Sequence, residues 1–122
     1  MMAGDTQVLG RWGESRVAEY MREHGWIILA IGFKCRFGEI DIIAENEQYL
    51  AFTEVKLRKN TRFGTAAEAV DERKQQRIIV TAQAYLSKHP TQLQPRFDVA
   101  EIYAPRGYNT SRPKINYIEN AF

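Results

Sequence analysis

The sequence predicts a single α/β domain, in which a mixed β-sheet is flanked by helices. Two long stretches have apolar residues at helical spacing, and five short stretches are β-rich or alternate between apolar and polar residues. The chain has 122 residues, of which 44% are hydrophobic, so residues 1–122 suffice for one core but not for two. The expected order is α-β-β-β-α-β-β.

The first helix is predicted from Thr6 to His24. Asp5 or Thr6 can cap its N-terminus, and Gly25 stands where helices commonly end. An apolar stripe follows the helical spacing and comprises Leu9, Trp12, Val17, Tyr20 and Met21.

Three strands are expected next. Residues 26–33 form a β-rich run, and residues 39–44 and 49–56 flank the polar segment 45–48. Such a short connection makes the second and third strands an antiparallel hairpin.

The second half of the chain predicts one helix and two strands. The helix ends near Lys88 and begins at about Thr65 or Asp71, because both residues are good N-caps. Strands are expected at 96–104 and 114–118, the latter at a sheet edge. A right-handed crossover through the helix makes strands 49–56 and 96–104 parallel.

Composition excludes several classes of protein. One cysteine, Cys35, permits no internal disulfide, and with two histidines it cannot build a Cys/His zinc site. No stretch approaches the roughly 18 apolar residues of a membrane helix, and no signal-peptide core follows Met1, so we expect a cytoplasmic protein. The formal net charge of +2 permits nucleic-acid binding without requiring it.

Charged residues interrupt the apolar face of the strand at 49–56. One face of this strand presents Leu50, Phe52, Glu54 and Lys56, because alternate residues point to the same side. Desolvating a carboxylate and an ammonium is costly unless they are paired or hold an ion. Taken alone, this pair is better explained by a salt bridge between Glu54 and Lys56 at a strand end.

The neighbouring strand adds a second carboxylate. One of its faces is expected to present Glu39, Asp41 and Ile43. A two-residue turn at 46–47 places Asp41 diagonal to Glu54, and a four-residue turn at 46–49 places it directly opposite. Both registers put the two carboxylates on one face, within roughly 4.5–8 Å at Cβ, whereas a three-residue turn separates them.

Glu14 brings a third carboxylate toward the same region. Val17, Ala18 and Met21 follow it at helical spacing, which places it on or beside the inward stripe, although a charge on the helix surface is an equally good interpretation. Clustered carboxylates repel one another, and Mg²⁺ or Mn²⁺ resolves that repulsion. A metal there, with Lys56 beside it, suits attack of water on a phosphate.

These residues resemble a known signature. Asp41 followed by Glu54-Val55-Lys56 resembles the Asp…Glu-x-Lys motif of the PD-(D/E)xK nuclease superfamily. Segments 36–41, 52–58 and 63–64 together resemble the YraN-type bacterial proteins, which are similar to archaeal Holliday junction resolvases. The resemblance covers about 9–104. Ile40 stands where the superfamily name has proline, which removes no ligand.

The resemblance implies a restriction-endonuclease-like fold and an Mg²⁺-dependent or Mn²⁺-dependent endonuclease acting on DNA, including branched DNA. It implies metal ligands at Asp41, Glu54, Glu14 and the Val55 carbonyl, and catalytic roles for Lys56 and for Lys74 or Gln75. Cleavage of a four-way junction needs two active sites, which favours a homodimer. A nucleic-acid-binding module of the same fold without turnover is the alternative.

Two sets of residues have competing explanations. Basic residues flank the expected site and suit phosphate contacts, or are solvated loop charges: Arg36, Arg58, Lys59 and Arg62. Lys74 lies near an apolar stripe, where lysines often reach solvent at the edge of a core. Asp98 is assigned a structural hydrogen-bonding role.

Overall fold

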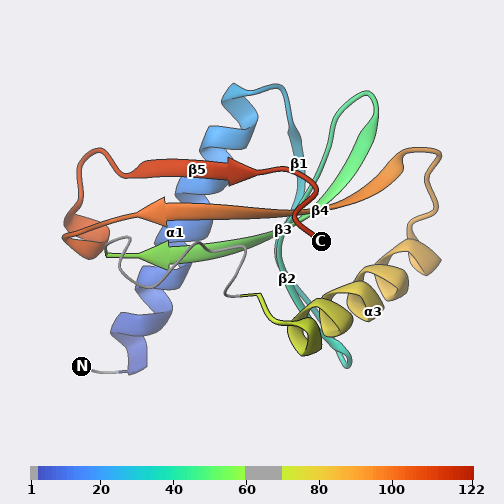
Figure 1. Ribbon diagram of the computed structural model, residues 1–122, viewed down its shortest axis with the longest axis horizontal. Helices are drawn as coiled ribbons and strands as arrows, with labels where there is room; N and C mark the ends of the chain where they lie inside the picture. The colour runs from blue at the N-terminus through green and yellow to red at the C-terminus, as the bar shows by residue number, and fades with distance from the viewer. Residues whose placement is uncertain (1–2, 60–69) are drawn as a thin grey trace.

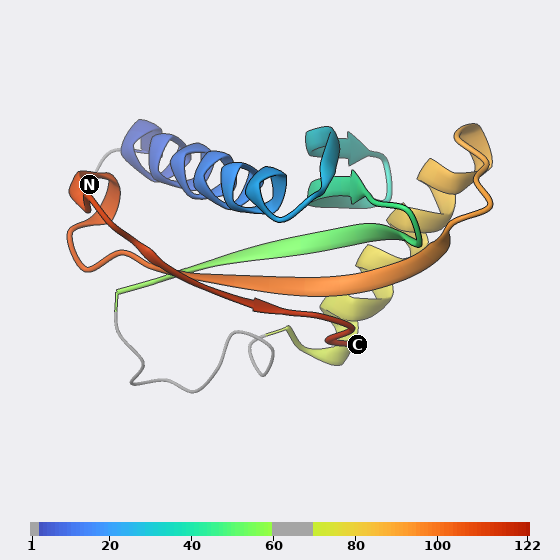
Figure 2. The same ribbon diagram turned by 90° about the horizontal axis from the view of Figure 1, so that it is seen from above.

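The computed structural model describes residues 3–59 and 70–122, and their arrangement is a five-stranded mixed sheet with a helix on each face (Figures 1 and 2). Helix α1 (Ala3–Glu23) covers one face and helix α3 (Glu72–Lys88) covers part of the other. The predicted α-β-β-β-α-β-β order is confirmed, and the architecture is consistent with a restriction-endonuclease-like fold. Within the described residues, no helix is both long and apolar enough to cross a membrane.

The strands follow one another in space in the order of the sequence. They are β1 (Ile27–Cys35), β2 (Gly38–Glu45), β3 (Tyr49–Arg58), β4 (Gln94–Tyr103) and β5 (Lys114–Ile118), with a short 3₁₀ helix η1 (Gly107–Asn109) before β5. All neighbours are antiparallel except β3 and β4, which are parallel, as the predicted crossover requires. The last strand lies at an edge, as predicted.

The helix ends differ slightly from those predicted. Helix α1 begins at Ala3 rather than Thr6, and Gly25, with φ of +90°, follows its end. Asp71 is the N-cap of α3, because its carboxylate accepts a hydrogen bond from the backbone N–H of Lys74 at 2.9 Å. The alternative start at Thr65 lies outside the described residues.

Two apolar cores stabilise the sheet, one under each helix. The core beneath α3 includes Ile40, Ile43, Leu50, Phe52, Ile78, Tyr85 and Val99. The core beneath α1 includes Val17, Ala18, Met21, Ile42, Ala44, Ala100 and Ile102. The strands are therefore buried on both faces where the helices cross them.

The hairpin of β2 and β3 has the register of a four-residue turn. Ile42 pairs with Thr53 and Glu45 with Leu50, and the side-chain oxygen of Asn46 accepts hydrogen bonds from backbone N–H groups in the turn. The same register continued by one residue sets Asp41 against Glu54. However, the ladder between the two strands ends at Ile42.

Beyond that point the two strands separate. The first residues of β2 continue along β1, whereas the second half of β3 continues along β4, which leaves a fork beside Asp41. The regular alternation of side chains also breaks here, because Ile40 and Ile43 pack in the same core although a regular strand would place them on opposite faces. The prediction that Glu39, Asp41 and Ile43 share one regular face was therefore wrong, because the strand changes course between Ile40 and Ile43.

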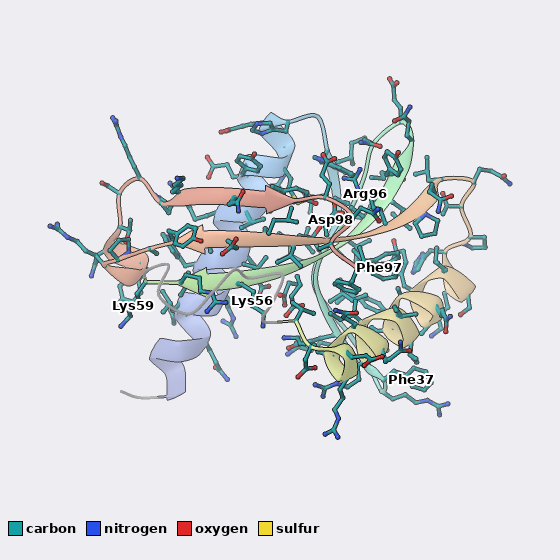
Figure 3. All side chains as sticks on the ribbon, in the orientation of Figure 1. Phe37, Lys56, Lys59, Arg96, Phe97 and Asp98 are labelled. Atoms are coloured by element: carbon teal, nitrogen blue, oxygen red, sulfur yellow. The ribbon has the colours of Figure 1, made fainter. Side chains whose placement is uncertain are left out.

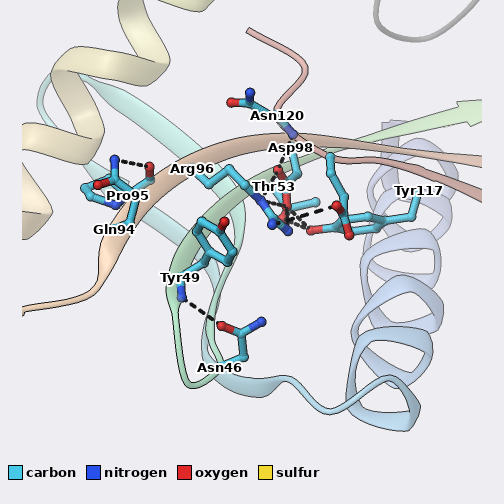
Figure 4. A network of polar contacts seen from close by, with 10 residues as sticks. Asn46, Tyr49, Thr53, Gln94, Pro95, Arg96, Asp98, Tyr117 and Asn120 are labelled. Carbon is cyan, nitrogen blue, oxygen red and sulfur yellow. Dashed lines mark hydrogen bonds and ion pairs between the residues drawn. The ribbon is translucent and has the colours of Figure 1, made fainter.

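A buried polar network joins β4 to β5 and to the segment that follows β5 (Figure 4). The Asp98 carboxylate is fully buried and accepts hydrogen bonds from Arg96 Nε at 2.9 Å, Tyr117 OH at 2.6 Å and the backbone N–H of Asn120 at 2.8 Å. The guanidinium of Arg96 lies 4.4 Å from the ring centroid of Tyr49. The structural role predicted for Asp98 is confirmed.

Candidate active site

The fork between β2 and β3 opens a cavity of about 220 Å³. Four elements contribute to its wall: α1, β2, β3 and α3. Their residues are Leu9, Gly10, Gly13, Glu14, Asp41, Glu54, Val55, Lys56, Leu57 and Lys74. A cavity that draws charged groups from both sides of a sheet requires such a fork, because a continuous ladder would separate them.

Asp41 is held at the base of the fork by the backbone of the strand that β2 has left. Its Oδ2 accepts a hydrogen bond from the backbone N–H of Val55 at 2.8 Å. The carboxylate therefore accepts from a backbone N–H of β3 that no longer pairs with β2. This contact fixes Asp41 beside Glu54, which precedes Val55 in the chain.

Glu54 is buried and faces two lysines (Figure 3 labels Lys56 on β3). Lys74 Nζ lies 2.6 Å from Glu54 Oε1, and Lys56 Nζ lies 3.8 Å from the same oxygen. The Glu54 side chain is 8% exposed, whereas the Lys56 and Lys74 side chains are 25% and 34% exposed. The two ammonium groups therefore stand between the buried carboxylate and solvent.

The environment favours a protonated carboxyl at Asp41. Burial, together with the charge of Glu54, raises the pKa of Asp41 to about 7, although the hydrogen bond from Val55 acts in the opposite direction. Burial and the charges of Glu39 and Glu54 also raise the pKa of Glu14. Excess negative charge at this point is the condition that a bound cation would relieve.

The two lysines are affected in opposite directions. Burial and the neighbouring Lys74 lower the pKa of Lys56. Burial also opposes the charge of Lys74, but its contact with Glu54 prevails and raises the pKa of Lys74. Lys74 is therefore the cation committed to Glu54, and Lys56 is the one whose proton is held less tightly.

The structure gathers six of the residues singled out from the sequence in one cavity: Glu14, Asp41, Glu54, Val55, Lys56 and Lys74. Gln75, the alternative to Lys74, instead donates its side-chain amide to the carbonyl of Val70.

The predicted basic residues lie elsewhere. Arg36 is at the tip of the β1–β2 hairpin, Arg58 is half-buried at the end of β3, and Lys59 is exposed just beyond it. None of these three lines the fork cavity, and Arg62 lies outside the described residues.

Other cations lie closer to the fork than sequence reasoning anticipated. Two larger cavities adjoin it, one sharing Lys74 and the other sharing Gly10 and Glu14. Their basic lining residues are Arg11, Lys34 and Arg77. Arg77 follows Lys74 by three residues on a helix, and this spacing was the available signal that both face the same way.

The donors in the fork suit a hard divalent cation that keeps part of its water shell. Across 3–59 and 70–122, no three Asp, Glu, His or Cys side chains converge closely enough to enclose a metal by themselves. Two carboxylates do meet, and Mg²⁺ characteristically takes one or two of them together with waters and substrate phosphate oxygens. Burial and the charge of Glu54 raise the pKa of Asp41 even though Lys74 lies 2.6 Å from Glu54, so a cation between the two carboxylates would be favourable. The residues present therefore fit Mg²⁺ or Mn²⁺.

Comparison with known proteins identifies the family. The family described as "Uncharacterised protein family UPF0102" matches residues 13–102. A UPF0102 protein from Caldanaerobacter subterraneus subsp. tengcongensis is 43% identical over 117 residues, which cover 95% of each chain. One from Nocardia farcinica is 42% identical over 121 residues, covering 98% of this chain and 92% of the relative. The chain therefore belongs to the UPF0102 family.

Proposed function

We propose that this protein is a nuclease that uses Mg²⁺ or Mn²⁺ to hydrolyse phosphodiester bonds in DNA. One observation carries the proposal: the fork brings Asp41, Glu54 and Lys56 into a single cavity, with a carboxyl whose pKa is raised to about 7. Two carboxylates and an adjacent lysine supply the groups that metal-assisted phosphodiester hydrolysis needs. The Asp…Glu-x-Lys resemblance supports the same reading.

Each group has a distinct role in this proposal. Asp41, Glu54 and the carbonyl of Val55 would hold the cation, and Glu14 would bind it directly or through water. The cation would lower the pKa of a bound water and neutralise charge on the phosphate. Lys56, whose pKa is lowered, lies close enough to Glu54 to orient the attacking water or to stabilise the pentacovalent phosphate.

A second candidate has its own supporting observation. Lys74 already neutralises Glu54 at 2.6 Å, which is the arrangement expected of a nucleic-acid-binding module that needs no metal. The two candidates differ in what a divalent ion does. A nuclease requires the ion for turnover, whereas a binding module gains nothing from it.

Cleavage of labelled DNA distinguishes the two candidates. Duplex, single-stranded, flapped and four-way-junction substrates would be incubated with Mg²⁺, Mn²⁺ or EDTA. We expect cleavage only with a divalent ion and none by Glu54→Gln, a substitution that keeps the shape of the side chain. Binding of these substrates without cleavage of any of them, by the folded protein in millimolar Mn²⁺, would favour the binding module instead.

Oligomeric state belongs to the same proposal. Symmetric cleavage of a four-way junction needs two active sites, so we propose a homodimer on that substrate. Sedimentation velocity with and without junction DNA measures this directly. A protein that stays monomeric on a junction that it cleaves would remove the dimer from the proposal.

A further inference from the structure

The tip of the β1–β2 hairpin presents an aromatic ring to solvent. Arg36 and Phe37 form the turn between the paired residues Cys35 and Gly38, and Phe37 is 43% exposed. The guanidinium of Arg36 lies 4.7 Å from the centroid of the Phe37 ring. Figure 3 shows Phe37 projecting beside α3, away from the central strands.

The hairpin tip is held against α3. A Cβ atom on Gly38 would stand 3.0 Å from Thr81 Oγ1, so the backbone at Gly38 and the helix are in close contact. Gly38 also has φ of +149°, a conformation that favours glycine. Phe37 is thus displayed from a fixed turn, which reduces the entropy lost when a ligand stacks on it.

A basic cavity lies between this tip and α3. It measures about 490 Å³, within the range of small-ligand sites, and is lined by Lys34, Cys35, Phe37, Gly38, Glu39, Lys74, Arg77 and Ile78. Three of these residues are cations and one is a carboxylate. Lys74 lines both this cavity and the fork, so the two cavities adjoin.

The cations are spaced along the helix. Lys74 and Arg77 are three residues apart, which corresponds to a rise of about 4.5 Å along an α-helix. Side chains three residues apart lie on the same side of a helix, so Lys74 and Arg77 both line this cavity.

We propose that this cavity is a subsite for an unpaired nucleotide next to the bond that is cut. The base stacks on Phe37, Lys34 and Arg77 contact its flanking phosphates, and the strand continues past Lys74 into the fork. Aromatic stacking on a base is tolerant of sequence, so the subsite selects DNA by the presence of an unpaired nucleotide. This inference rests on the proposed nuclease function for its substrate, DNA.

Binding in EDTA tests the subsite separately from cleavage. Fluorescence anisotropy would compare a duplex carrying a three-nucleotide single-stranded overhang with a blunt duplex of the same length. We expect tighter binding of the overhang, and we expect Phe37→Ala to remove that preference, by roughly 5-fold to 150-fold for one stacked base. Phe37→Tyr should retain it. Arg77→Ala should reduce the log–log salt dependence of overhang binding by about one.

Tyr108→Ala is the matched control, because Tyr108 is also an exposed aromatic, 50% exposed, on η1 rather than at the hairpin tip. It should leave the preference intact. 2-Aminopurine in the overhang supplies a direct signal, since stacking on Phe37 should quench its fluorescence in the wild type but not in Phe37→Ala.

Three outcomes would overturn the subsite: equal affinity of the wild type for both DNAs, equal losses in Phe37→Ala and Tyr108→Ala, or tighter binding of an RNA overhang than of DNA. Absence of cleavage with the Phe37-dependent preference intact would overturn only the nuclease proposal.

Discussion

Replacing Asp41 with asparagine should stabilise the metal-free protein above neutral pH. Burial and the charge of Glu54 raise the pKa of the Asp41 carboxyl from its ordinary 3.8 to about 7 in the folded protein. The folded state therefore binds a proton that the unfolded state has already released between these two values. Stability falls as pH rises through this interval, and the deficit is complete above about pH 7.

The size of this effect follows from the two pKa values. Each pKa unit corresponds to about 1.4 kcal/mol, so the interval from 3.8 to about 7 represents on the order of 4 kcal/mol at pH 8. This is an upper bound, because Glu54 shares the repulsion. Asparagine removes the charge but keeps an oxygen that can accept the hydrogen bond from Val55. Domains of this size have total stabilities of about 5–15 kcal/mol, so the gain is readily measured.

Urea unfolding in EDTA at several pH values measures the effect. The stability difference between Asp41→Asn and wild type should be near zero at pH 4 and grow to its full value by pH 8. Millimolar Mg²⁺ or Mn²⁺ should then stabilise wild type but not Asp41→Asn, because a ligand bound only to the folded state stabilises it. Asp71→Asn, at an exposed N-cap that accepts asparagine equally well, is the control. It should not gain stability toward pH 8, and the metal ion should still stabilise it. A stability difference that stays constant from pH 4 to pH 8 would refute the reasoning.

Three further predictions follow from the contacts described. Lys74→Met should raise the affinity for Mn²⁺ measured by calorimetry, because it frees Glu54 from its 2.6 Å ion pair. Unchanged or weaker affinity would count against a metal at Glu54. Lys56→Ala should suppress single-turnover cleavage far more than DNA affinity, and equal losses would reduce Lys56 to a phosphate contact. Asp98→Ala should lower stability by about 3–5 kcal/mol in urea unfolding, because the buried Arg96 loses its close partner and keeps only Glu119 at 3.9 Å. A loss below about 1 kcal/mol would contradict that account.

Local patterns in the sequence predicted most of the fold. The polar segment 45–48 limited the hairpin to a few registers, one of which is observed, and Asp71 was one of two expected caps. The parallel pairing of β3 and β4 followed from the handedness of crossovers alone. These features depend on neighbouring residues or on general topology, so a single sequence is enough to anticipate them.

The fork could not be anticipated in the same way. The sequence predicted that side chains alternate regularly between the two faces of the strand through Asp41. This prediction fails because β2 continues along β1 and separates from β3, which depends on the packing of the whole sheet. The basic cavities were missed for a related reason. Lys34 and Arg77 are distant in sequence, and they line one cavity because the hairpin tip lies close to α3 at Gly38.

The parallel pairing at the centre of the sheet also bears on the order of folding. Strands β1, β2 and β3 are consecutive in the sequence and pair antiparallel. By contrast, the pairing of Tyr49 in β3 with Gln94 in β4 joins residues that are far apart in the sequence. Contacts of long sequence separation form late, because the chain entropy of closing the loop is lost before they contribute.

Asp41 and Glu54 belong to the antiparallel strands β2 and β3, whose pairing is local in sequence, whereas Lys74 lies on helix α3, which connects β3 to β4. If the proposed metal is bound by those two carboxylates, Mg²⁺ can neutralise them before Lys74 arrives. Refolding monitored by stopped-flow fluorescence should then be faster in Mg²⁺ than in EDTA, and Asp41→Asn should refold at the same rate in both.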